Sequence, residues 1–580
     1  MSTFIHEKSG LEMECDNEYE SQDDVISIDT IIDTEIIRDK LLYSFPLDED
    51  REMKFGIVKI NTDVMPILNK VLFFLFTVDS SGSMSDLCND RRTKNAHIIH
   101  TLTNMLRFFS EKENISIYVQ VDAFDDTITS IIQLVQVSPA NVEELIIKLK
   151  KIQPRNSTNI ELALKNASEQ IDAASKTLVV AEKHHIFMTD GDITQGNACE
   201  KHLKTLLNPT ATNVFIGFGI DHNIKVLSEL GGGNDPSSSV NNYYFIDVLE
   251  NSGLVYGEII HNILYASLKH VELIVVNGLI YNWKTNEWTN TLNIGNVIFE
   301  TEKVYHIVSF VDLDRDVEVG TPTIISASGF VENADNPFFY TQYTSNSSVL
   351  ESIAKYKYRQ RTQQLLYLAR HFDDYKNQGE IKKKLDDFFN ELKACVDGLG
   401  VGLGVGLEGV QGLDVAINDK PFMKLLMDDV YITRKMFGTT YNSLYSNARQ
   451  TSQGTQRCYN VGHLSTDSTV GVNIPRITRH VTHHLTDEDG FGFGAGLGAG
   501  IGAGLGAGLG AWSVTQPYNK LYEEDEEKDG LLGTGHEERD EYEISQNVDT
   551  PYSTPALLGI MRQISAPTQQ YGFFKDDDFL

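Results

Sequence analysis

The sequence predicts a multidomain chain organised around an α/β domain with a doubly wound parallel sheet. Residues 71–78 (VLFFLFTV) form a continuous apolar run rich in β-formers, as in a strand that is buried on both faces. A second run of this kind, 185–189, ends like the first at an aspartate. Between them, residues 93–109 carry apolar side chains at helical spacing. Alternating strands and amphipathic helices are typical of an open sheet with helices on both faces.

Oxygen-bearing side chains stand where these strands end. Asp79, Ser81 and Ser83 follow the first strand with the spacing D-x-S-x-S, and Asp190 follows the second. Thr158 precedes a further helix in the sequence NSTN. In an open α/β sheet, ligands bind at the carboxyl ends of the strands. Carboxylates and hydroxyls are hard donors that suit Mg²⁺ or Mn²⁺ and not zinc, so these five residues predict a divalent-cation site.

With these five positions in this order, residues 68–266 resemble a von Willebrand factor A (VWA) domain with a complete metal-ion-dependent adhesion site. The resemblance implies a bound Mg²⁺, or else Mn²⁺ or Ca²⁺. We expect Ser81 and Ser83 to bind it directly and Thr158 to bind it directly or through water. Asp79 and Asp190 would act largely through waters. An Asp or Glu carboxylate of a partner protein would then fill the open position on the ion.

The remaining parts of the chain differ in composition. Residues 54–61 read as a strand without a nearby partner, so we expect them to pair with a strand from 271–330 and make the VWA domain an insertion. Asn277-Gly278 predicts a hairpin turn. The expected parts are an acidic, largely flexible segment (1–50), a small β-sandwich (51–67 and 269–345), the VWA domain (68–266), a helical domain (346–397 and 414–450), a glycine-rich loop (398–413), and a glycine-rich linker with an acidic disordered tail (451–580).

The helical domain is expected from apolar stripes in 349–396 and 418–437. These stripes need a partner surface, because a lone amphipathic helix of such length is marginal in water. We therefore expect the helices to pack on one another across the glycine-rich loop.

The composition argues against several classes of partner. With 49 Lys and Arg against 82 Asp and Glu, the formal net charge is −33, which repels the phosphate backbone of nucleic acid. The five cysteines form no CxxC motif and the first residues have no apolar signal-peptide core, so we expect an intracellular protein. The uncharged tract 490–511 is long enough to cross a bilayer. Glycine and alanine supply little transfer energy, however, which favours a linker and argues against a membrane partner.

The expected function is a divalent-cation-dependent protein–protein interaction module in an intracellular scaffold or adaptor. The layout also resembles that of intracellular VWA proteins of protists and of large DNA viruses. A structural role, such as a component of a virion or scaffold, is the alternative. A metal-assisted hydrolase is the weaker alternative, because the sequence has no G-x-S-x-G motif, no P-loop and no second cluster of ligands. We expect no enzyme activity.

Overall fold

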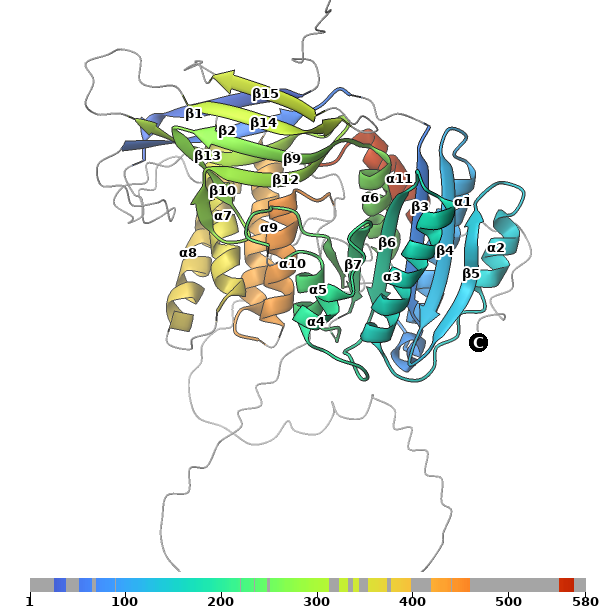
Figure 1. Cartoon of the computed structure of the whole chain (residues 1–580). Coiled ribbons are helices and arrows are strands. Elements are labelled where there is room, and N and C mark those ends of the chain that lie inside the picture. The colour runs from blue at the N-terminus through green and yellow to red at the C-terminus, as the bar shows by residue number, and fades with distance from the viewer. Residues whose placement is uncertain are drawn as a thin grey trace, which may run out of the picture. The chain divides into compact units, whose positions relative to one another are not determined.

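Three β-sheets and the helices around them make up the part of the chain that the structure describes (Figure 1). The glycine-rich loop 398–413 lies outside the described residues, as do the tract 490–511 and the acidic clusters of the tail. The structure is a computed structural model, and it describes residues 26–37, 52–64, 69–88, 90–219, 221–233, 235–247, 251–311, 323–331, 337–343, 353–372, 377–397, 419–439, 441–458 and 552–567.

The α/β domain contains a six-stranded sheet. Its strands in chain order are β3 (Val71–Asp79), β4 (Ser116–Phe124), β5 (Ile128–Gln136), β6 (Glu182–Thr189), β7 (Thr212–Phe218) and β8 (Tyr243–Ile246). They lie in the order β5-β4-β3-β6-β7-β8, and every neighbouring pair is parallel except β4 and β5. The chain starts at the centre and winds to both edges, so the doubly wound sheet is confirmed, with an antiparallel strand at one edge.

Helices connect these strands. They are α1 (Lys94–Ser110), α2 (Val142–Leu149), α3 (Ile160–Thr177), α4 (Glu200–Thr205), α5 (Ile224–Leu230) and α6 (Ser252–Leu264), with a 3₁₀ turn, η2 (Gly82–Ser85). Side-chain caps fix where the two longest of these six α-helices begin. The Thr93 hydroxyl accepts from Ala96 N at the start of α1, and the Asn159 side chain accepts from Leu162 N at the start of α3.

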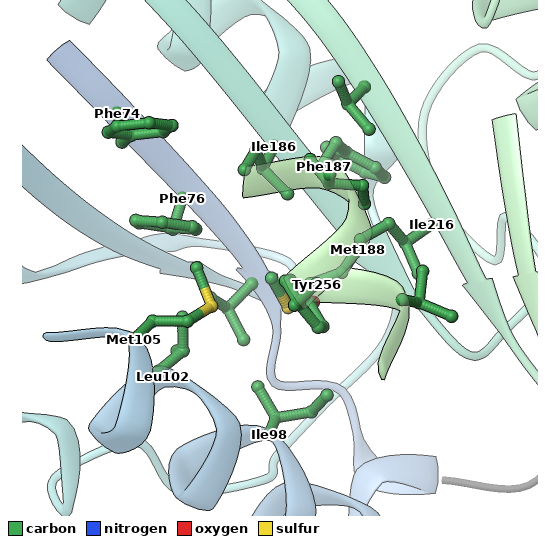
Figure 2. Close-up of a cluster of buried hydrophobic side chains, with 14 of the residues drawn as sticks. Phe74, Phe76, Ile98, Leu102, Met105, Ile186, Phe187, Met188, Ile216 and Tyr256 are labelled. Atoms are coloured by element: carbon green, nitrogen blue, oxygen red, sulfur yellow. The ribbon is translucent and has the colours of Figure 1, made fainter. Parts of the chain in front are cut away.

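Alternate side chains of β3 point to opposite faces of the sheet. Phe73 and Leu75 contact a small core that includes Ile171 of α3. Phe74 and Phe76, which point to the other face, belong to a larger core with side chains from α1, β6, β7 and α6. Those labelled in Figure 2 are Phe74, Phe76, Ile98, Leu102, Met105, Ile186, Phe187, Met188, Ile216 and Tyr256. Burial on both faces explains the continuous apolar run of β3 and fixes the position of the polar residues at its end.

Two smaller sheets share a second core, with side chains such as Val58 and Ile307 from one sheet and Leu273 and Ile325 from the other. The strands are β1 (Ser27–Ile36), β2 (Glu52–Asn61), β9 (Ala266–Val276), β10 (Gly278–Asn282), β11 (Glu287–Thr289), β12 (Thr291–Ile298), β13 (Lys303–Val311), β14 (Ile324–Val331) and β15 (Pro337–Tyr343). The sheet orders are β1-β2-β13-β10-β11 and β12-β9-β14-β15. Because β2 pairs with β13, the expected pairing of 54–61 with a strand from 271–330 is confirmed. The α/β domain lies between these two strands in the sequence.

The N-terminal segment contains a strand that the sequence analysis did not expect. Residues 1–50 are predicted to be largely flexible, yet β1 pairs antiparallel with β2, from Ser27 opposite Asn61 to Ile36 opposite Lys54. Ile28 and Ile31 of this strand are buried. The apolar pattern of the segment is short and broken by acids, and its partner strand becomes evident only in the folded sheet.

The expected hairpin at Asn277-Gly278 is wrong. β9 pairs with β12 and β14, whereas β10 pairs with β11 and β13, so the chain crosses here from one sheet to the other. Asn277 adopts a positive φ of 57°. A methyl group on Gly278 would lie only 2.4 Å from Val308 O. The Asn-Gly dipeptide therefore allows the chain to turn sharply from one sheet into the other.

A group of helices follows the sheets: α7 (Ala354–Arg370), α8 (Gln378–Val396), α9 (Lys420–Met436) and α10 (Asn442–Thr455). Rings of α8 contact α7 and α9, with Phe388 beside Tyr358 and Phe389 beside Tyr431. The prediction that the helices of 349–396 and 418–437 pack on one another is therefore confirmed.

Helix α10 has a polar sequence and is nevertheless buried. Arg449 Nη1 donates to Asp429 Oδ1 of α9 at 2.8 Å, and Gln453 Nε2 donates to Asp429 Oδ2 at 2.6 Å. Gln450 Nε2 reaches the carbonyl oxygen of Trp283, which follows β10, at 2.6 Å. The expectation of a linker and disordered tail over 451–580 is therefore wrong for the end of α10.

It is also wrong for residues 552–567, which hold the last helix, α11 (Pro555–Ser565). α11 contacts α1 and α6 of the α/β domain. Within the described ranges, no helix combines the length and the hydropathy needed to cross a membrane.

Candidate metal centre

The Asp79 carboxylate lies where the ends of two neighbouring strands meet. β3 and β6 are parallel, with Val78 opposite Met188, so Asp79 and Thr189 end their strands side by side. The Thr189 hydroxyl donates to Asp79 Oδ2 at 2.5 Å, and Ser81 N donates to Asp79 Oδ1 at 2.7 Å. Both oxygens of this buried carboxylate are thereby held in place, and the loop that follows β3 turns around it.

The two serine hydroxyls lie between Asp79 and the loop after β6. Ser81 Oγ is 3.1 Å from Ser83 Oγ, and Ser83 Oγ donates to Asp190 Oδ1 at 2.7 Å. The first turn of η2 places these side chains two residues apart on the same side of the loop. Four of the five residues named from the sequence therefore form one connected group.

Thr158 reaches the same point from a third loop. A methyl group on Gly191 would lie 3.5 Å from Thr158 Oγ1 and 3.7 Å from Ser83 Oγ, so the two hydroxyls flank one position. Backbone bonds hold the loop there: Gly82 N donates to Asn156 O at 3.1 Å. Thr158 N donates to the hydroxyl of Thr194 at 2.7 Å. The structure thus brings together all five residues named from the sequence.

An ion pair that the sequence analysis did not identify positions the Thr158 loop. Arg155 Nε donates to Asp125 Oδ2 at 2.5 Å, and Asn159 N donates to Asp125 O at 3.0 Å. Asp125 follows β4 and is buried. Its place at the carboxyl end of a strand next to β3 is the signal that was available in the sequence.

Lys94 is the second residue that the sequence analysis missed. Its ammonium lies 2.6 Å from Asp190 Oδ2 and 3.5 Å from Asp86 Oδ2. Burial alone would lower the pKa of Lys94, but the hydrogen bonds and charges of these carboxylates outweigh burial and raise it. A lysine in the first turn of a helix opposes the helix dipole, which was the only sequence signal for a nearby carboxylate.

The electrostatics of the group favour a further cation. Burial, together with the charge of Asp190, raises the pKa of Asp79 from 3.8 to about 6, against the lowering effect of its bonds from Thr189 and Ser81. Lys94 brings one positive charge to the carboxylates of Asp79 and Asp190, and it bonds to Asp190. The group is therefore short of positive charge at neutral pH, and its donors are all oxygens, so the residues fit a hard divalent cation. Among the residues that the structure describes, no group of three or more His, Cys, Asp and Glu side chains offers an alternative metal site.

The α/β domain that holds this group matches a known family. Residues 74–253 match the family model described as "von Willebrand factor type A domain". This part of the chain is a VWA domain. No curated protein matches the sequence.

Solved structures that resemble the chain share little sequence with it. The ArnB paralog VWA2 from Sulfolobus acidocaldarius is 13% identical, with a TM-score of 0.42 over 74% of this chain and 98% of that chain. A von Willebrand factor type A protein from Catenulispora acidiphila is 12% identical, with a TM-score of 0.40 over 71% of this chain and 89% of that chain. Proximal thread matrix protein 1 from the mussel byssus, with a zinc-occupied MIDAS motif, is 16% identical, with a TM-score of 0.28 over 36% of this chain and 50% of that chain.

The five residues of the candidate site are largely covered. Asp79, Ser81, Thr158 and Asp190 are 0–3% exposed, and Ser83 is half-buried. Gly82 beside it is exposed. Most of the group is therefore covered, and Ser83 and Gly82 are its most accessible part.

The pKa of Asp79 predicts how cation binding depends on pH. A cation favours the ionised carboxylate, so affinity for Mg²⁺ is expected to be roughly tenfold lower at pH 5 than at pH 7. The stability of the protein without a cation depends on pH in the opposite sense. The raised pKa means that protonated Asp79 stabilises the folded state. That contribution to stability is present below pH 3.8 and lost as the pH rises to about 6. Titration calorimetry with Mg²⁺ at the two pH values measures the first effect, and equal affinities would contradict it.

Proposed function

We propose that the VWA domain of this chain is a divalent-cation-dependent protein-binding module that recognises an Asp or Glu side chain of a partner protein. The observation that carries the proposal is the group itself: three loops deliver three hydroxyls and two buried carboxylates to one position, and the Lys94 ammonium lies 2.6 Å from Asp190. We further propose that the module belongs to an intracellular scaffold or adaptor and that it has no catalytic activity.

Ser81, Ser83 and Thr158 would hold Mg²⁺, or Mn²⁺ or Ca²⁺, through their hydroxyl oxygens. Asp79 and Asp190 would orient these hydroxyls and balance the charge of the ion. The ion would supply a positive centre with an open coordination position, to which a carboxylate binds in a charge-assisted contact. This contact would offset the repulsion between an acidic partner and a chain whose net charge is −33.

The hydrogen bonds of the two serines favour a binding role for them over a role as nucleophiles. The Ser83 hydroxyl donates to Asp190, and its other near neighbour is the Ser81 hydroxyl, so both serines take part in holding the group together. Activation of a serine nucleophile calls for a base, and Asp190 is already paired with Lys94 at 2.6 Å.

Selection of peptides from a random display library on the full chain tests the proposal. In Mg²⁺ we expect the bound peptides to share an Asp or Glu at one position, and we expect EDTA to release them. Exchange of that residue for Asn or Gln is expected to abolish binding, since the amide brings no charge to the ion.

A chain that selects the same peptides in EDTA would contradict the proposal. That result would favour the alternative, a structural component of a particle or scaffold whose contacts do not depend on the cation. The same selection with Ca²⁺ and Mn²⁺ compares the ions.

A further inference from the structure

The last described helix, α11, has sequence signals for both of its ends. The Thr554 hydroxyl accepts from Leu557 N at 3.2 Å, and Pro555 occupies the first helical position. Pro567 follows shortly after the helix ends. A helix of this length is marginal in water by itself. α11 therefore carries its own boundary signals and still depends on a partner surface.

One face of α11 is apolar and buried, and the opposite face is exposed. The buried side chains recur at helical spacing and join the larger core of the VWA domain: they are Leu557, Ile560, Met561 and Ile564. Gly559, Arg562 and Gln563 lie on the exposed side. This pattern is the one by which an amphipathic helix binds a complementary surface.

The surface beneath α11 is shaped for a helix backbone. We call it the α1–α6 surface and define it by Gly253 and Gly257 of α6 and Asn104 of α1. A methyl group on Gly257 would lie 2.6 Å from Met561 Cα, and one on Gly253 would lie 2.7 Å from Ser565 Cα. The two glycines thus allow α11 to lie directly against the backbone of α6.

Asn104 satisfies the end of the helix. Its side-chain nitrogen donates to Ile564 O at 2.8 Å and to Ala566 O at 2.9 Å. Carbonyl groups in the last turn of a helix have no partner within that helix, so a donor from another element marks where α11 must stop. The α1–α6 surface therefore fits both the apolar stripe and the C-terminal end of one helix.

A second anchor holds the residues before α11. The Tyr552 hydroxyl donates to Gln453 Oε1 of α10 at 3.1 Å, and its ring meets that of Phe422 edge to face. The preceding described part of the chain ends at Cys458, whose backbone N donates to Glu258 of α6 at 2.8 Å. The two ends of the interval 459–551 are thus held by different elements, Cys458 by α6 and Tyr552 by α9 and α10.

We propose that the α1–α6 surface is a reversible helix-binding site and that residues 552–567, the docking segment, are its tethered ligand. The segment leaves and rebinds as a unit. This inference is independent of the metal centre and of the function proposed for it.

Cutting the connection separates a tethered ligand from a fixed part of the core. A protease site inserted after Gly530 in the full chain allows the docking segment to be cut free without touching any described residue. A labelled peptide of residues 552–567 is then added to cut and uncut protein, and its binding is followed by fluorescence anisotropy. A tethered ligand meets its site at an effective concentration on the order of millimolar. Micromolar peptide is therefore expected to bind the cut protein at least about tenfold better than the uncut protein.

Two peptide variants make the test specific, and neither alters the folding of the protein. Met561→Asp puts a carboxylate on the buried face and is expected to weaken binding at least about tenfold. Gly559→Asp adds the same carboxylate on the exposed face, where a side chain would meet nothing within 4 Å, and is expected to bind nearly as the unaltered peptide does.

The proposal is overturned if the cut fragment exchanges only under conditions that unfold the protein, since α11 would then be an integral part of the core. It is equally overturned if the fragment leaves and neither it nor the peptide rebinds. Exchange of the fragment at a temperature at which the protein stays folded supports it.

Discussion

Replacing Asp79 with Asn is expected to weaken the binding of Mg²⁺ by about 10- to 100-fold, the range typical when the residues that support metal ligands are changed. The carboxylate contributes a buried negative charge beside Asp190, and the amide removes it. Asn keeps an oxygen for Ser81 N and a polar group opposite the Thr189 hydroxyl, so both hydrogen bonds around position 79 can be retained. Titration calorimetry with Mg²⁺ on the wild-type and variant chains measures the effect.

Asn is the informative choice at position 79. An alanine there is expected to leave Ser81 N and the Thr189 hydroxyl unpaired in a buried place, which confuses loss of metal with loss of stability. Asp192→Asn is the matched control, because it removes the same charge from an exposed residue two positions after Asp190. We expect that control to bind Mg²⁺ almost as tightly as the wild type. Equal weakening by both variants would mean that net charge, and not the site, governs binding.

Replacing Arg449 with Met is expected to lower the free energy of unfolding by about 3–5 kcal/mol, the loss typical when one member of a buried ion pair is removed. Arg449 and Asp429 are both fully buried and pair at 2.8 Å. Burial raises the pKa of Asp429, and Arg449 opposes that rise, so the carboxylate is left uncompensated without its partner. Denaturant unfolding followed by tryptophan fluorescence measures the loss, and Trp283 reports on the place where Gly454 of α10 lies against its ring.

Two further variants separate the buried charge from the shape of the side chain. Adding Asp429→Asn to Arg449→Met removes the unpaired charge and keeps an acceptor for Gln453, so we expect at least half of the lost stability to return. Arg107→Met deletes an arginine whose partner Glu143 is mostly exposed, and should cost no more than about 1 kcal/mol. A double variant as unstable as the single one would show that packing of the arginine side chain dominates.

The parts of the fold that sequence predicts well are those set by local pattern. The apolar run of β3, the acid that ends it and the order of the five oxygen-bearing residues are enough to predict where these residues come together. Parallel strands and their loops then bring Asp79 and Asp190 together, as the general rule for open sheets requires.

The parts that sequence predicts poorly depend on partners far along the chain. Lys94 meets Asp190 across 96 positions, and Gln450 meets Trp283 across 167, so no local pattern announces either contact. Helix α10 shows this most clearly, because a row of polar residues normally indicates an exposed face. Here Arg449, Gln450 and Gln453 form hydrogen bonds with other elements, which allows this polar helix to be buried. The strand β1 was missed for a similar reason, since only β2 reveals its apolar side as a core face.

The pairing of β2 with β13 has a consequence for how the chain folds. These strands meet only after a loop of roughly 240 residues has been closed, and such long-range pairing is slow to form. Within that loop, Lys70 Nζ lies 3.3 Å from Ala266 O, across 196 positions. A VWA domain that has already folded therefore brings its own two ends together and shortens the remaining loop about fivefold. By the usual logarithmic dependence on loop length, this lowers the entropic cost of pairing β2 with β13 by about 1.5 kcal/mol. The insertion therefore favours an order of folding in which the VWA domain forms first and β2 pairs with β13 afterwards.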